Sequence, residues 1–543
     1  MNQNIIYSVV PEPTRTRTER GLSHEGSVIA VMNVGQPRTE EQRPQLSNAI
    51  RRICSIEDLP PELLRCIFLF AAPAFDADEE VPAYEDEERC AAHPGHLVAR
   101  VCRLWRNIAL QLPALWTTVD FNDGFQQAEA YLELSRNAPV TISLDLTKPI
   151  RGQSEDIRDS DMDEDVERIF LPLIMPHVSR WRSLRFSSDD AHSMLRVLVA
   201  MSKCGPAPLL EELLLSRPVA RSRVEIGYMP LLFATWSKLI LFQDNAPKLT
   251  HLALRGIYLN WAESRCFSGL HRLELAYHAE PVRPEYKEFA RILNSSPNLH
   301  TLILRNSGPF EGLDEWMESM GLSEDDDWLP LIVVLRSLRK LVLDFTSYRT
   351  EFLLKCLDFG SLEELEISSP SGSPSSFMRS LVQRPEAFAG LRSLSVSGLR
   401  TRDYVIEFYA VMPNLTTLTL DFRRMSREWY RNARRPPLAR FGGFMGHAAG
   451  MFFPRLDTLV TTGVNGRMMC ALVGERRDAG MPLRCVHMHA GDRIRPDRLA
   501  WLAENVEVFG LFRHPEDGYV ATAEEDENSD AVSDDDSDLD EDE

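Results

Sequence analysis

Residues 299–304 read LHTLIL and contain the pattern that decides the fold. Leu302 and Leu304 stand two positions apart, so in an extended strand their side chains point to the same side. Leu299 opens the pattern three positions before Leu302. One short strand cannot bury this row of leucines alone. The stretch therefore requires neighbouring strands of the same kind, stacked so that their leucines form a continuous core.

The pattern L-x-x-L-x-L recurs between residues 181 and 488. Clear copies are LEELLL (210–215), LTHLAL (249–254), LHRLEL (270–275), LRKLVL (338–343), LEELEI (362–367), LRSLSV (391–396) and LTTLTL (415–420), and weaker ones are WRSLRF (181–186), LDTLVT (456–461) and LRCVHM (483–488). Successive copies start 21 to 41 residues apart, and most spacings lie within the 20–29 residues of a leucine-rich repeat. An ordinary α/β domain is the alternative, but it does not explain so many copies at such spacings.

Helices are expected between the strands. The stretch EYKEFARILNSS (285–296) places Phe289, Ile292 and Leu293 at helical spacing. A first, degenerate helix–strand unit is predicted at 131–146, with Val140, Ile142, Leu144 and Leu146 in its strand. The sequence thus predicts an α/β fold, with an irregular leucine-rich-repeat solenoid over 121–512. Its parallel strands would line the concave side and its helices the convex side.

Charge is unevenly distributed along the 543 residues. The net charge is −21, and the last stretch, 524–543, has 13 acidic residues and no basic one. Such a run cannot bury apolar surface, so residues 513–543 are expected to be a disordered acidic tail. Residues 1–52 are polar, without sustained periodicity, and are expected to be a disordered arm. An acidic chain is also a poor binder of nucleic acid, which makes a nucleic-acid partner unlikely on this ground.

The cysteine pattern and hydropathy bear on the compartment. The nine cysteines include no CxxC pair, and several lie inside apolar patterns, which favours reduced thiols. The N-terminus lacks the charged and apolar regions of a secretory signal. No stretch approaches the roughly 20 apolar residues of a membrane helix. These observations predict a protein of the cytoplasm, the nucleus or both, without a membrane partner.

A compact helical region is predicted at 53–120. In SIEDLPPELLRCIFLFAA (55–72), apolar residues from Leu59 to Ala71 follow one stripe of a helix. A second helix is predicted at about 97–111, ended by Pro113. Between the helices lies an acidic insertion at 73–96, expected to form an exposed loop. The region is too small to bury all its apolar groups, so part of them should face a partner.

The same residues resemble the F-box, a short three-helix module, most closely in its fungal versions. The resemblance rests on LPPELL (59–64), on the Val-Cys-x-x-Trp pattern at 101–105 and on the ALW end at 114–116. The acidic insertion departs from the family. The resemblance as a whole is to F-box/leucine-rich-repeat proteins, whose F-box docks onto the Skp adaptor of Skp–cullin–F-box ubiquitin ligases. It implies that adaptor contacts are made or supported by Leu59, Pro60, Leu63, Leu64, Ile67, Phe68, Val101, Trp105, Leu115 and Trp116. The alternative is that these stripes pack only against the first repeats.

A candidate substrate surface follows from strand geometry. Residues between and beside the core leucines should face the concave side, because side chains alternate along a strand. They are His251, Arg255, Arg272, Glu274, Arg305, Lys340, Asp344, Glu366, Thr419 and Asp421. Their charges are mixed, so the sequence does not indicate the charge of a substrate.

Two further stretches contain residue types that can form binding sites. FRRMSREWYRNARR (422–435), with Arg440, interleaves arginines and aromatics inside a long repeat spacing. A solvated arginine-rich loop is the first interpretation; docking of an acidic or phosphorylated segment, or of the chain's own tail, is the alternative. CVHMH (485–489) offers a thiol and two imidazoles, but a zinc site usually needs four ligands and no second cluster is near in sequence. No metal and no cofactor are therefore expected.

Two functions of different classes remain. The first is a non-catalytic substrate receptor of a Skp–cullin–F-box ubiquitin ligase, holding the adaptor and, through it, a cullin at one end and an unidentified protein substrate on the repeats. The second is a leucine-rich-repeat scaffold, without ubiquitin chemistry, whose acidic tail engages basic partners. An enzyme ranks third, because no P-loop, HExxH, GxSxG or comparable motif occurs.

Overall fold

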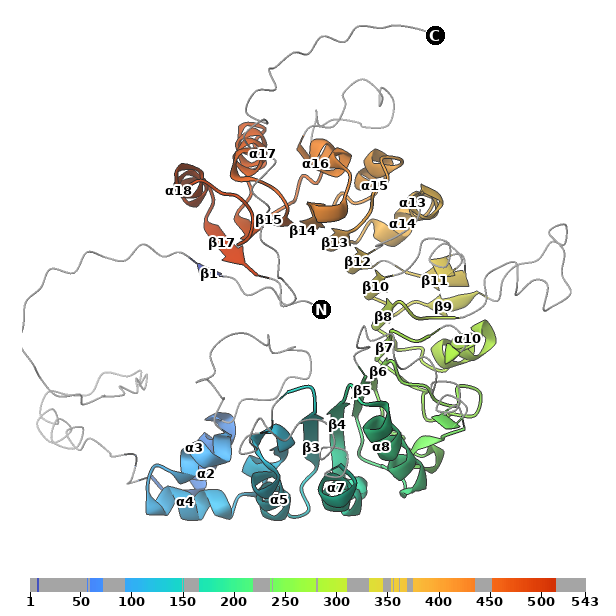
Figure 1. The fold of residues 1–543 in the computed structure, drawn as a ribbon. Helices are drawn as coiled ribbons and strands as arrows, with labels where there is room; N and C mark the ends of the chain where they lie inside the picture. Colours follow the sequence, from blue (N-terminus) through green and yellow to red (C-terminus); the bar gives the residue numbers. More distant parts are fainter. Residues whose placement is uncertain are drawn as a thin grey trace, which may run out of the picture.

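The computed structural model is an α/β protein built around one large, mainly parallel sheet (Figure 1). The structure describes residues 7–8, 56, 59–71, 93–148, 150, 166–217, 235–236, 238–279, 282–309, 332–344, 353–354, 356–360, 362–368, 375–434 and 452–513. Of the predicted segments, nearly all of the arm 1–52, the insertion up to residue 92, residues 435–440 and the tail beyond residue 513 lie outside these ranges.

Strands follow the predicted repeats closely. The strands of the large sheet are β1 (Tyr7–Ser8), β2 (Thr118–Asp120), β3 (Val140–Asp145), β4 (Trp181–Ser187), β5 (Glu212–Ser216), β6 (His251–Arg255), β7 (Arg272–Ala276), β8 (Thr301–Arg305), β10 (Lys340–Asp344), β12 (Glu364–Ser368), β13 (Ser393–Ser397), β14 (Thr417–Asp421), β15 (Thr458–Thr462), β16 (Cys485–His489) and β17 (Val508–Phe512). The short strands β9 (Val333–Leu335) and β11 (Leu357–Phe359) form a separate parallel pair. Each copy of the leucine pattern lies on one strand of the large sheet, which confirms the predicted parallel α/β fold.

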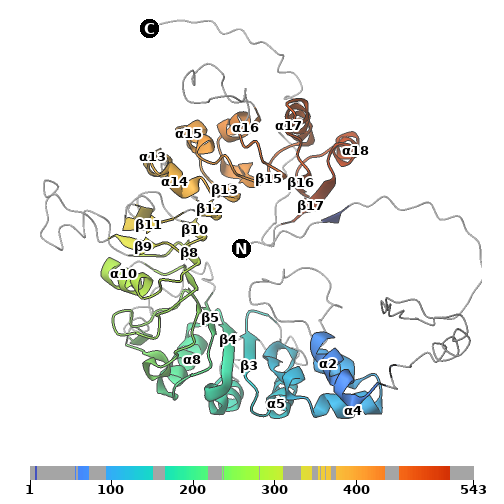
Figure 2. The ribbon, with the colours of Figure 1, turned by 180° about the vertical axis from the view of Figure 1, so that it is seen from behind.

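Strand order in the large sheet follows chain order. From β2 to β17 each strand pairs in parallel with the one before it, apart from the detour through β9 and β11. The sheet curves into an open arc, with the strands on its inner side and the helices on its outer side, as the view from behind also shows (Figure 2). The first helices and the last strand lie at opposite ends of the arc.

The leucine pattern explains this pairing. Leu302 of β8 lies in register with Leu273 of β7 and Leu341 of β10, and all three are buried. Leu304, two positions further along β8, likewise lies in register with Leu275 of β7 and Leu343 of β10. Most strands of the sheet thus extend two rows of apolar side chains, mainly leucines, whose outward side is covered by helices. The continuous core predicted from stacked repeats is present in the described part of the chain.

Helices cover the outer side. They are α2 (Pro61–Ala71), α3 (Pro94–Ala99), α4 (Arg103–Leu110), α5 (Phe125–Leu134), α7 (Leu171–Ile174), α8 (Ala191–Lys203), α10 (Tyr286–Asn294), α13 (Ser375–Val382), α14 (Pro385–Phe388), α15 (Val405–Ala410), α16 (Arg427–Arg434), α17 (Gly466–Asp478) and α18 (Pro496–Asn505). Short 3-10 or π turns are η3 (Pro113–Trp116), η4 (Phe121–Asp123), η5 (Val166–Phe170), η6 (Met175–Arg180), η8 (Leu241–Asp244) and η10 (Phe422–Arg424). In α10, Phe289, Ile292 and Leu293 are buried as predicted.

Three details differ from the sequence predictions. The helix expected at 97–111 is broken into α3 and α4, because Cys102 is extended and caps α4 by accepting the Trp105 N–H on its Sγ at 3.5 Å. The sheet begins with β2, before the expected boundary at 120/121. Within the arm expected to be disordered, Tyr7–Ser8 forms a strand that pairs antiparallel with β17.

Candidate functional site

The N-terminal helices, α2 to α4 with η3, form a small helical module at one end of the arc (Figure 1). Helix α2 packs against α4 through Phe68 and Trp105, whose ring centroids are 4.7 Å apart. Leu64 and Phe68 are buried on one side of α2, while Leu63 and Ile67, one residue earlier in each case, are exposed. The predicted stripe is therefore split between an inner and an outer face.

Trp116 joins the helical module to the sheet. Its Nε1–H donates to the Ala109 carbonyl at 2.8 Å, and its ring stacks on His93, which stacks in turn on Tyr131 of α5. Gly95 permits this closeness, because a Cβ there would come within 2.8 Å of the Trp116 ring. Burial lowers the pKa of His93, so this ring stays neutral at physiological pH.

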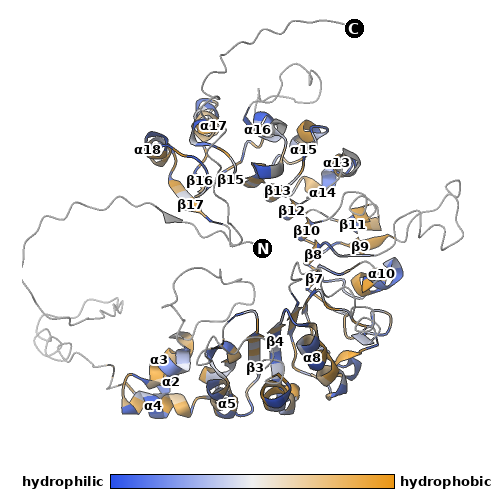
Figure 3. Ribbon diagram, viewed as in Figure 1, coloured by the Kyte–Doolittle hydropathy of each residue, from blue (hydrophilic) through white to orange (hydrophobic). Residues whose placement is uncertain are grey.

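The outer side of the helical module carries an apolar surface. Its exposed side chains are Ile56, Leu63, Ile67, Leu69, Phe70, Leu97, Val101, Leu104 and Leu110. Among the described residues, only five other large apolar side chains are comparably exposed, and those are scattered along the chain. Figure 3 shows that apolar residues are frequent in these helices although they lie at the end of the molecule. Nine exposed apolar side chains in so small a part of the described chain are typical of an interface with another protein.

The ten residues predicted to contact or support contact with an adaptor differ in their exposure. Leu64, Phe68, Leu115 and Trp116 are buried, so they support the helical module from inside and offer no area to a partner. Leu63, Pro60, Ile67 and Val101 are exposed, and Leu59 and Trp105 are half-buried. Sequence reasoning missed Leu69, Phe70, Leu97, Leu104 and Leu110. Helical periodicity alone could have indicated them, had the break at Cys102 been recognised.

The ten residues predicted for the inner face all lie on strands, at positions that alternate with the core leucines. They form three rows across the sheet, following the register. His251, Arg272 and Lys340 lie in the first row, Glu274, Glu366 and Thr419 in the second, and Arg255, Arg305, Asp344 and Asp421 in the third. The alternation of side chains along each strand places these residues on one face of the sheet, but their exposure differs because neighbouring side chains cover some of them.

Glu274 is the most deeply buried of these residues. Its side chain is 3 % exposed and accepts a hydrogen bond from Arg255 at 2.6 Å, and Arg272 lies 3.9 Å away. Burial raises the pKa of Glu274, but the charge and hydrogen bond of Arg255, with the charge of Arg272, outweigh it and leave the pKa below its ordinary value. This carboxylate is held ionised by its neighbours and contributes to the stability of the sheet.

A second ion pair spans three strands. Arg305 of β8 contacts Glu366 of β12 at 3.0 Å, across the intervening β10. Asp344 of β10 lies in the same region. Its burial raises its pKa, the charge of Arg305 acts in the opposite direction, and the charge of Glu366 raises the pKa further. Lys340 pairs with Glu364 at 2.8 Å nearer the edge of the face. The charged part of the inner face is therefore largely paired within the protein.

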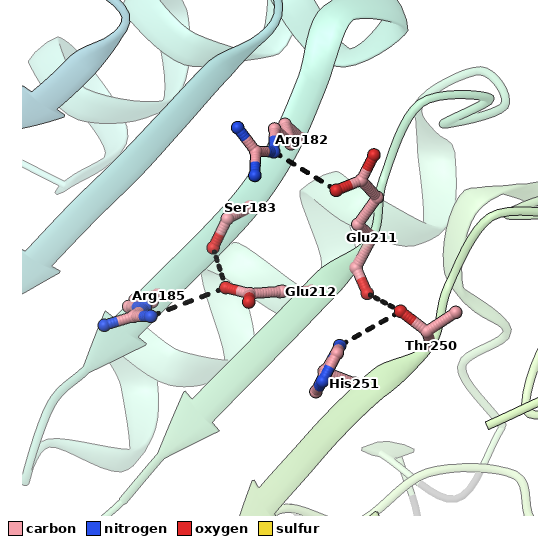
Figure 4. A network of polar contacts seen from close by, with 7 residues as sticks. All are labelled: Arg182, Ser183, Arg185, Glu211, Glu212, Thr250 and His251. Atoms are coloured by element: carbon pink, nitrogen blue, oxygen red, sulfur yellow. Dashed lines mark hydrogen bonds and ion pairs between the residues drawn. The ribbon is translucent and has the colours of Figure 1, made fainter. Parts of the chain in front are cut away.

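A third network, near the N-terminal end of the sheet, was not predicted (Figure 4). Glu212 of β5 accepts a hydrogen bond from the Ser183 hydroxyl at 2.8 Å and contacts Arg185 of β4 at 3.4 Å. The neighbouring Glu211 pairs with Arg182 at 3.1 Å. The signal that could have found Arg185 and Glu212 is the alternation used for the later strands, which also applies to the weak copies.

The inner face changes character toward the C-terminal end. There the strands β13 to β15 contribute mostly hydroxyls at the same register positions, namely Ser393, Ser395, Ser397, Thr417, Thr419, Thr458 and Thr462. Asp421, which pairs with Arg423 at 2.7 Å, and the apolar Val460 are the exceptions. An uncharged polar face follows a charged one along the same sheet.

The arginine-rich stretch is helical over the part that the structure describes, so the prediction of a solvated loop is wrong for 427–434. Its α16 buries Trp429, whose Nε1–H donates to the Thr401 carbonyl at 3.2 Å. Tyr430 donates to the Met468 carbonyl at 2.8 Å, and Arg434 pairs with Glu475 at 2.8 Å. The aromatics that suggested a binding loop are core residues of the helical layer.

The CVHMH stretch forms β16, and its alternation is that of a strand. His487 and His489 are buried. Among the described residues, no group of three or more His, Cys, Asp or Glu side chains is placed to hold a metal ion.

Comparison with known protein families and with characterised proteins finds no match to this chain. Within the described ranges, the model has no helix of the length and apolar character needed to cross a bilayer.

Proposed function

We propose that this protein is the substrate-recognition subunit of a Skp–cullin–F-box ubiquitin ligase. In this proposal the helical module is an F-box, and the arc is a leucine-rich-repeat solenoid. The observation that carries the proposal is the apolar surface on α2 to α4. Leu63 is 51 % and Val101 60 % exposed, in a region where Leu64 is fully buried. A stable helical module that keeps such side chains outside is suited to a protein partner.

The partner of the apolar surface would be the Skp adaptor, and through it a cullin. This partner comes from the resemblance of LPPELL and of the Val-Cys-x-x-Trp pattern to the F-box. The ring of the half-buried Trp105 packs against the ring of the buried Phe68, and this contact joins the helices that carry the exposed residues. Burying the leucines, isoleucines, valine and phenylalanine of the apolar surface would contribute about 25 cal/mol for each Å² of apolar area removed from water.

The substrate would lie along the inner face of the arc. The paired charges of β6 to β12 can recognise a partner only by exchanging ion pairs, because their carboxylates already face guanidinium or ammonium groups. The hydroxyl-rich strands β13 to β15 offer neutral donors and acceptors. The chain itself would perform no chemistry; it would raise the local concentration of substrate lysines near a ubiquitin donor held by the assembly.

The direct test is binding of the purified Skp adaptor to the full chain. Val101→Glu places a charge in the apolar surface, and we expect it to weaken binding at least tenfold, about 1.4 kcal/mol. Val334→Glu is the matched control, because Val334 is 45 % exposed but lies on β9, outside the helical module. It should bind as the unmutated chain does. Calorimetry or biolayer interferometry measures both.

Two results would overturn the proposal. One is absence of adaptor binding by the unmutated, folded chain. The other is equal loss of binding in Val101→Glu and Val334→Glu, which would show that the contact is not made by the apolar surface. Either result would favour the scaffold alternative, whose basic partners would bind through the acidic tail.

A further inference from the structure

Residues 423–426 read RRMS and place two arginines just before a serine. Arg423 lies three positions and Arg424 two positions before Ser426. Among the serines and threonines of the described ranges, only Ser426 has arginines at both of these positions. Protein kinases with an acidic substrate cleft select this spacing, because their carboxylates pair with arginine side chains. The stretch therefore has the pattern of a phosphorylation site.

Ser426 stands immediately before α16, at the N-cap position. Its carbonyl accepts the Trp429 N–H at 3.2 Å, so the first turn of the helix starts from this residue. The helix itself begins with Arg427, a basic residue at the end where the helix dipole is already positive. A phosphate on Ser426 would add about −1.5 to −2 charges at this end, where negative charge is favourable.

The backbone that leads to Ser426 is held by long hydrogen bonds. Residues Phe422–Arg424 form the turn η10, and Met425 is extended, with φ −102° and ψ 159°. The Met425 N–H donates to the Phe422 carbonyl and the Ser426 N–H to the Leu399 carbonyl, both at 3.4 Å. These distances exceed the ordinary range of N–H···O bonds. Opening of 423–426 is therefore cheap, and it leaves α16 anchored by the fully buried Trp429.

Arg423 already binds a carboxylate. Its guanidinium contacts Asp421 through Nε at 2.9 Å and through Nη2 at 2.7 Å. Arg423 and Ser426 both keep part of their surface in contact with solvent. Carboxylates of a kinase could thus take the place of Asp421 during recognition. After modification, the phosphate on Ser426 would compete with Asp421 for the same guanidinium, because it is the stronger acceptor.

We propose that Ser426 is phosphorylated by a protein kinase that recognises the arginines two and three positions before it. The γ-phosphoryl group of ATP passes to the Ser426 Oγ: the bond between the γ-phosphorus and the bridging oxygen of ADP breaks, and the Oγ–P bond forms. ADP leaves, and the hydroxyl proton passes to the catalytic aspartate of the kinase. The phosphate then pairs with Arg423 and changes the charge beside Asp421, at the rim of the hydroxyl-rich inner face. This inference does not depend on the adaptor proposal.

Phosphorylation of the full chain by the catalytic subunit of cyclic-AMP-dependent protein kinase tests the site. Tandem mass spectrometry locates the phosphate, and we expect it on Ser426. Arg424→Ala should lower the initial rate at this serine about tenfold, because one arginine–carboxylate pair is lost. Arg431→Ala is the matched control, because it removes an arginine of the same stretch that follows the serine by five positions. It should keep the rate of the unmutated chain.

A synthetic peptide of residues 419–431 shows whether the fold closes the site. Phosphorylation of the peptide without phosphorylation of Ser426 in the full chain would overturn the proposal, since the folded chain would then withhold the serine. Failure of both substrates would overturn it too, because the arginines would not suffice for recognition. Equal rates for Arg424→Ala and Arg431→Ala would have the same consequence.

The contact made by the phosphate has its own measurement. With phosphoserine genetically encoded at position 426, phosphorus NMR follows its second ionisation, whose pKa is ordinarily about 6. We expect a pKa below this value, because the start of α16 and Arg423 favour the dianion. Arg423→Gln should bring the pKa back toward about 6, whereas Arg392→Gln, at the opposite edge of the sheet, should leave it lowered. The same pKa in both variants would refute the pairing with Arg423.

Discussion

Apolar side chains of the sheet are buried in the arc, whereas many of those in the helical module are exposed. In the arc, Leu302 and its register neighbours Leu273 and Leu341 are buried between strands and helices, and polar groups cover the inner face. In the helical module, Phe70 is 92 % exposed and Val101 60 %. A repeat inside the arc is covered by the repeat on each side, whereas the described part of the helical module packs against the rest of the protein at α5.

This difference separates stability from recognition. An apolar residue of the arc contributes to folding because its surroundings are already complete. An exposed apolar residue of α2 or α4 contributes little to folding and is available for a partner. Substitutions at buried and at exposed apolar positions should therefore differ in their effects on the free energy of unfolding and on binding.

The largest effect is expected from Leu302→Ala in β8. It removes a fully buried side chain from the continuous core and should lower the free energy of unfolding by about 2–5 kcal/mol. Leu63→Ala, at a half-exposed position of α2, should lower it by less than about 0.5 kcal/mol. Urea unfolding followed by circular dichroism measures both. Equal losses would show that the apolar surface is a folding core after all.

A smaller effect is expected from Glu274→Gln. The change removes the charge that faces Arg255 and Arg272 and should cost about 1–3 kcal/mol. Glu364→Gln, which loses a more exposed pair with Lys340, should cost less than about 1 kcal/mol.

The pH dependence of Glu274 has a defined sign. Its folded pKa is below that of the unfolded chain, so its contribution is complete above the unfolded pKa of about 4.3 and is lost as pH falls through the folded value. The unmutated chain should therefore lose more stability than Glu274→Gln between about pH 5 and pH 3. Parallel curves for the two proteins would contradict the ion-pair assignment.

Asp492 should act in the opposite direction. Its folded pKa is raised to about 7 by burial, whereas the unfolded group titrates near 3.9, so stability falls as pH rises between these values. Asp492→Asn should reduce this fall by about 1–2 kcal/mol between pH 5 and pH 8, allowing for solvent screening. Thermal unfolding of the unmutated chain and of Asp492→Asn at several pH values measures this difference, and equal slopes would contradict it.

The smallest effect on stability is expected from Phe70→Ser. Phe70 is almost fully exposed, so the free energy of unfolding should change by less than about 0.5 kcal/mol. Binding of an apolar dye should nevertheless decrease, because the apolar surface becomes smaller. Phe68→Ser, two positions away and buried against Trp105, should instead disrupt α2. Similar unfolding curves for the two variants would contradict the split of α2 into inner and outer faces.

Much of the arc was predictable because its pattern is local. The spacing of Leu299, Leu302 and Leu304 sets both the strand and its buried side, and repetition sets the pairing. Strand β17 is not indicated by the pattern, because VFGLF lacks the leucine spacing and contains Gly510, although Phe509 and Leu511 lie in register with the core positions Val486 and Met488 of β16. Helix α16 is not indicated by its sequence, because its many arginines favour an exposed segment, although Trp429 and Tyr430 pack inward.

The exposed site was predicted only in part, because burial depends on contacts between segments. LPPELL indicates an apolar helix, but nothing in it distinguishes Leu63 from the adjacent Leu64. Leu63 is half exposed, whereas Leu64 is fully buried. That choice is made by the packing of α2 against α4 and η3, which lie about 40 to 50 positions further along the chain. The break at Cys102, which turns Val101 outward, likewise depends on local capping that periodicity does not reveal.

By itself, the sequence determined the repeated strands, the side on which their leucines lie and the alternation that places charges on the inner face, since side-chain direction in a strand follows from position alone. The tertiary structure decided which charges are paired and which apolar residues of α2 to α4 stay outside. Those outcomes depend on distances between residues far apart in the chain, and no local pattern sets such distances.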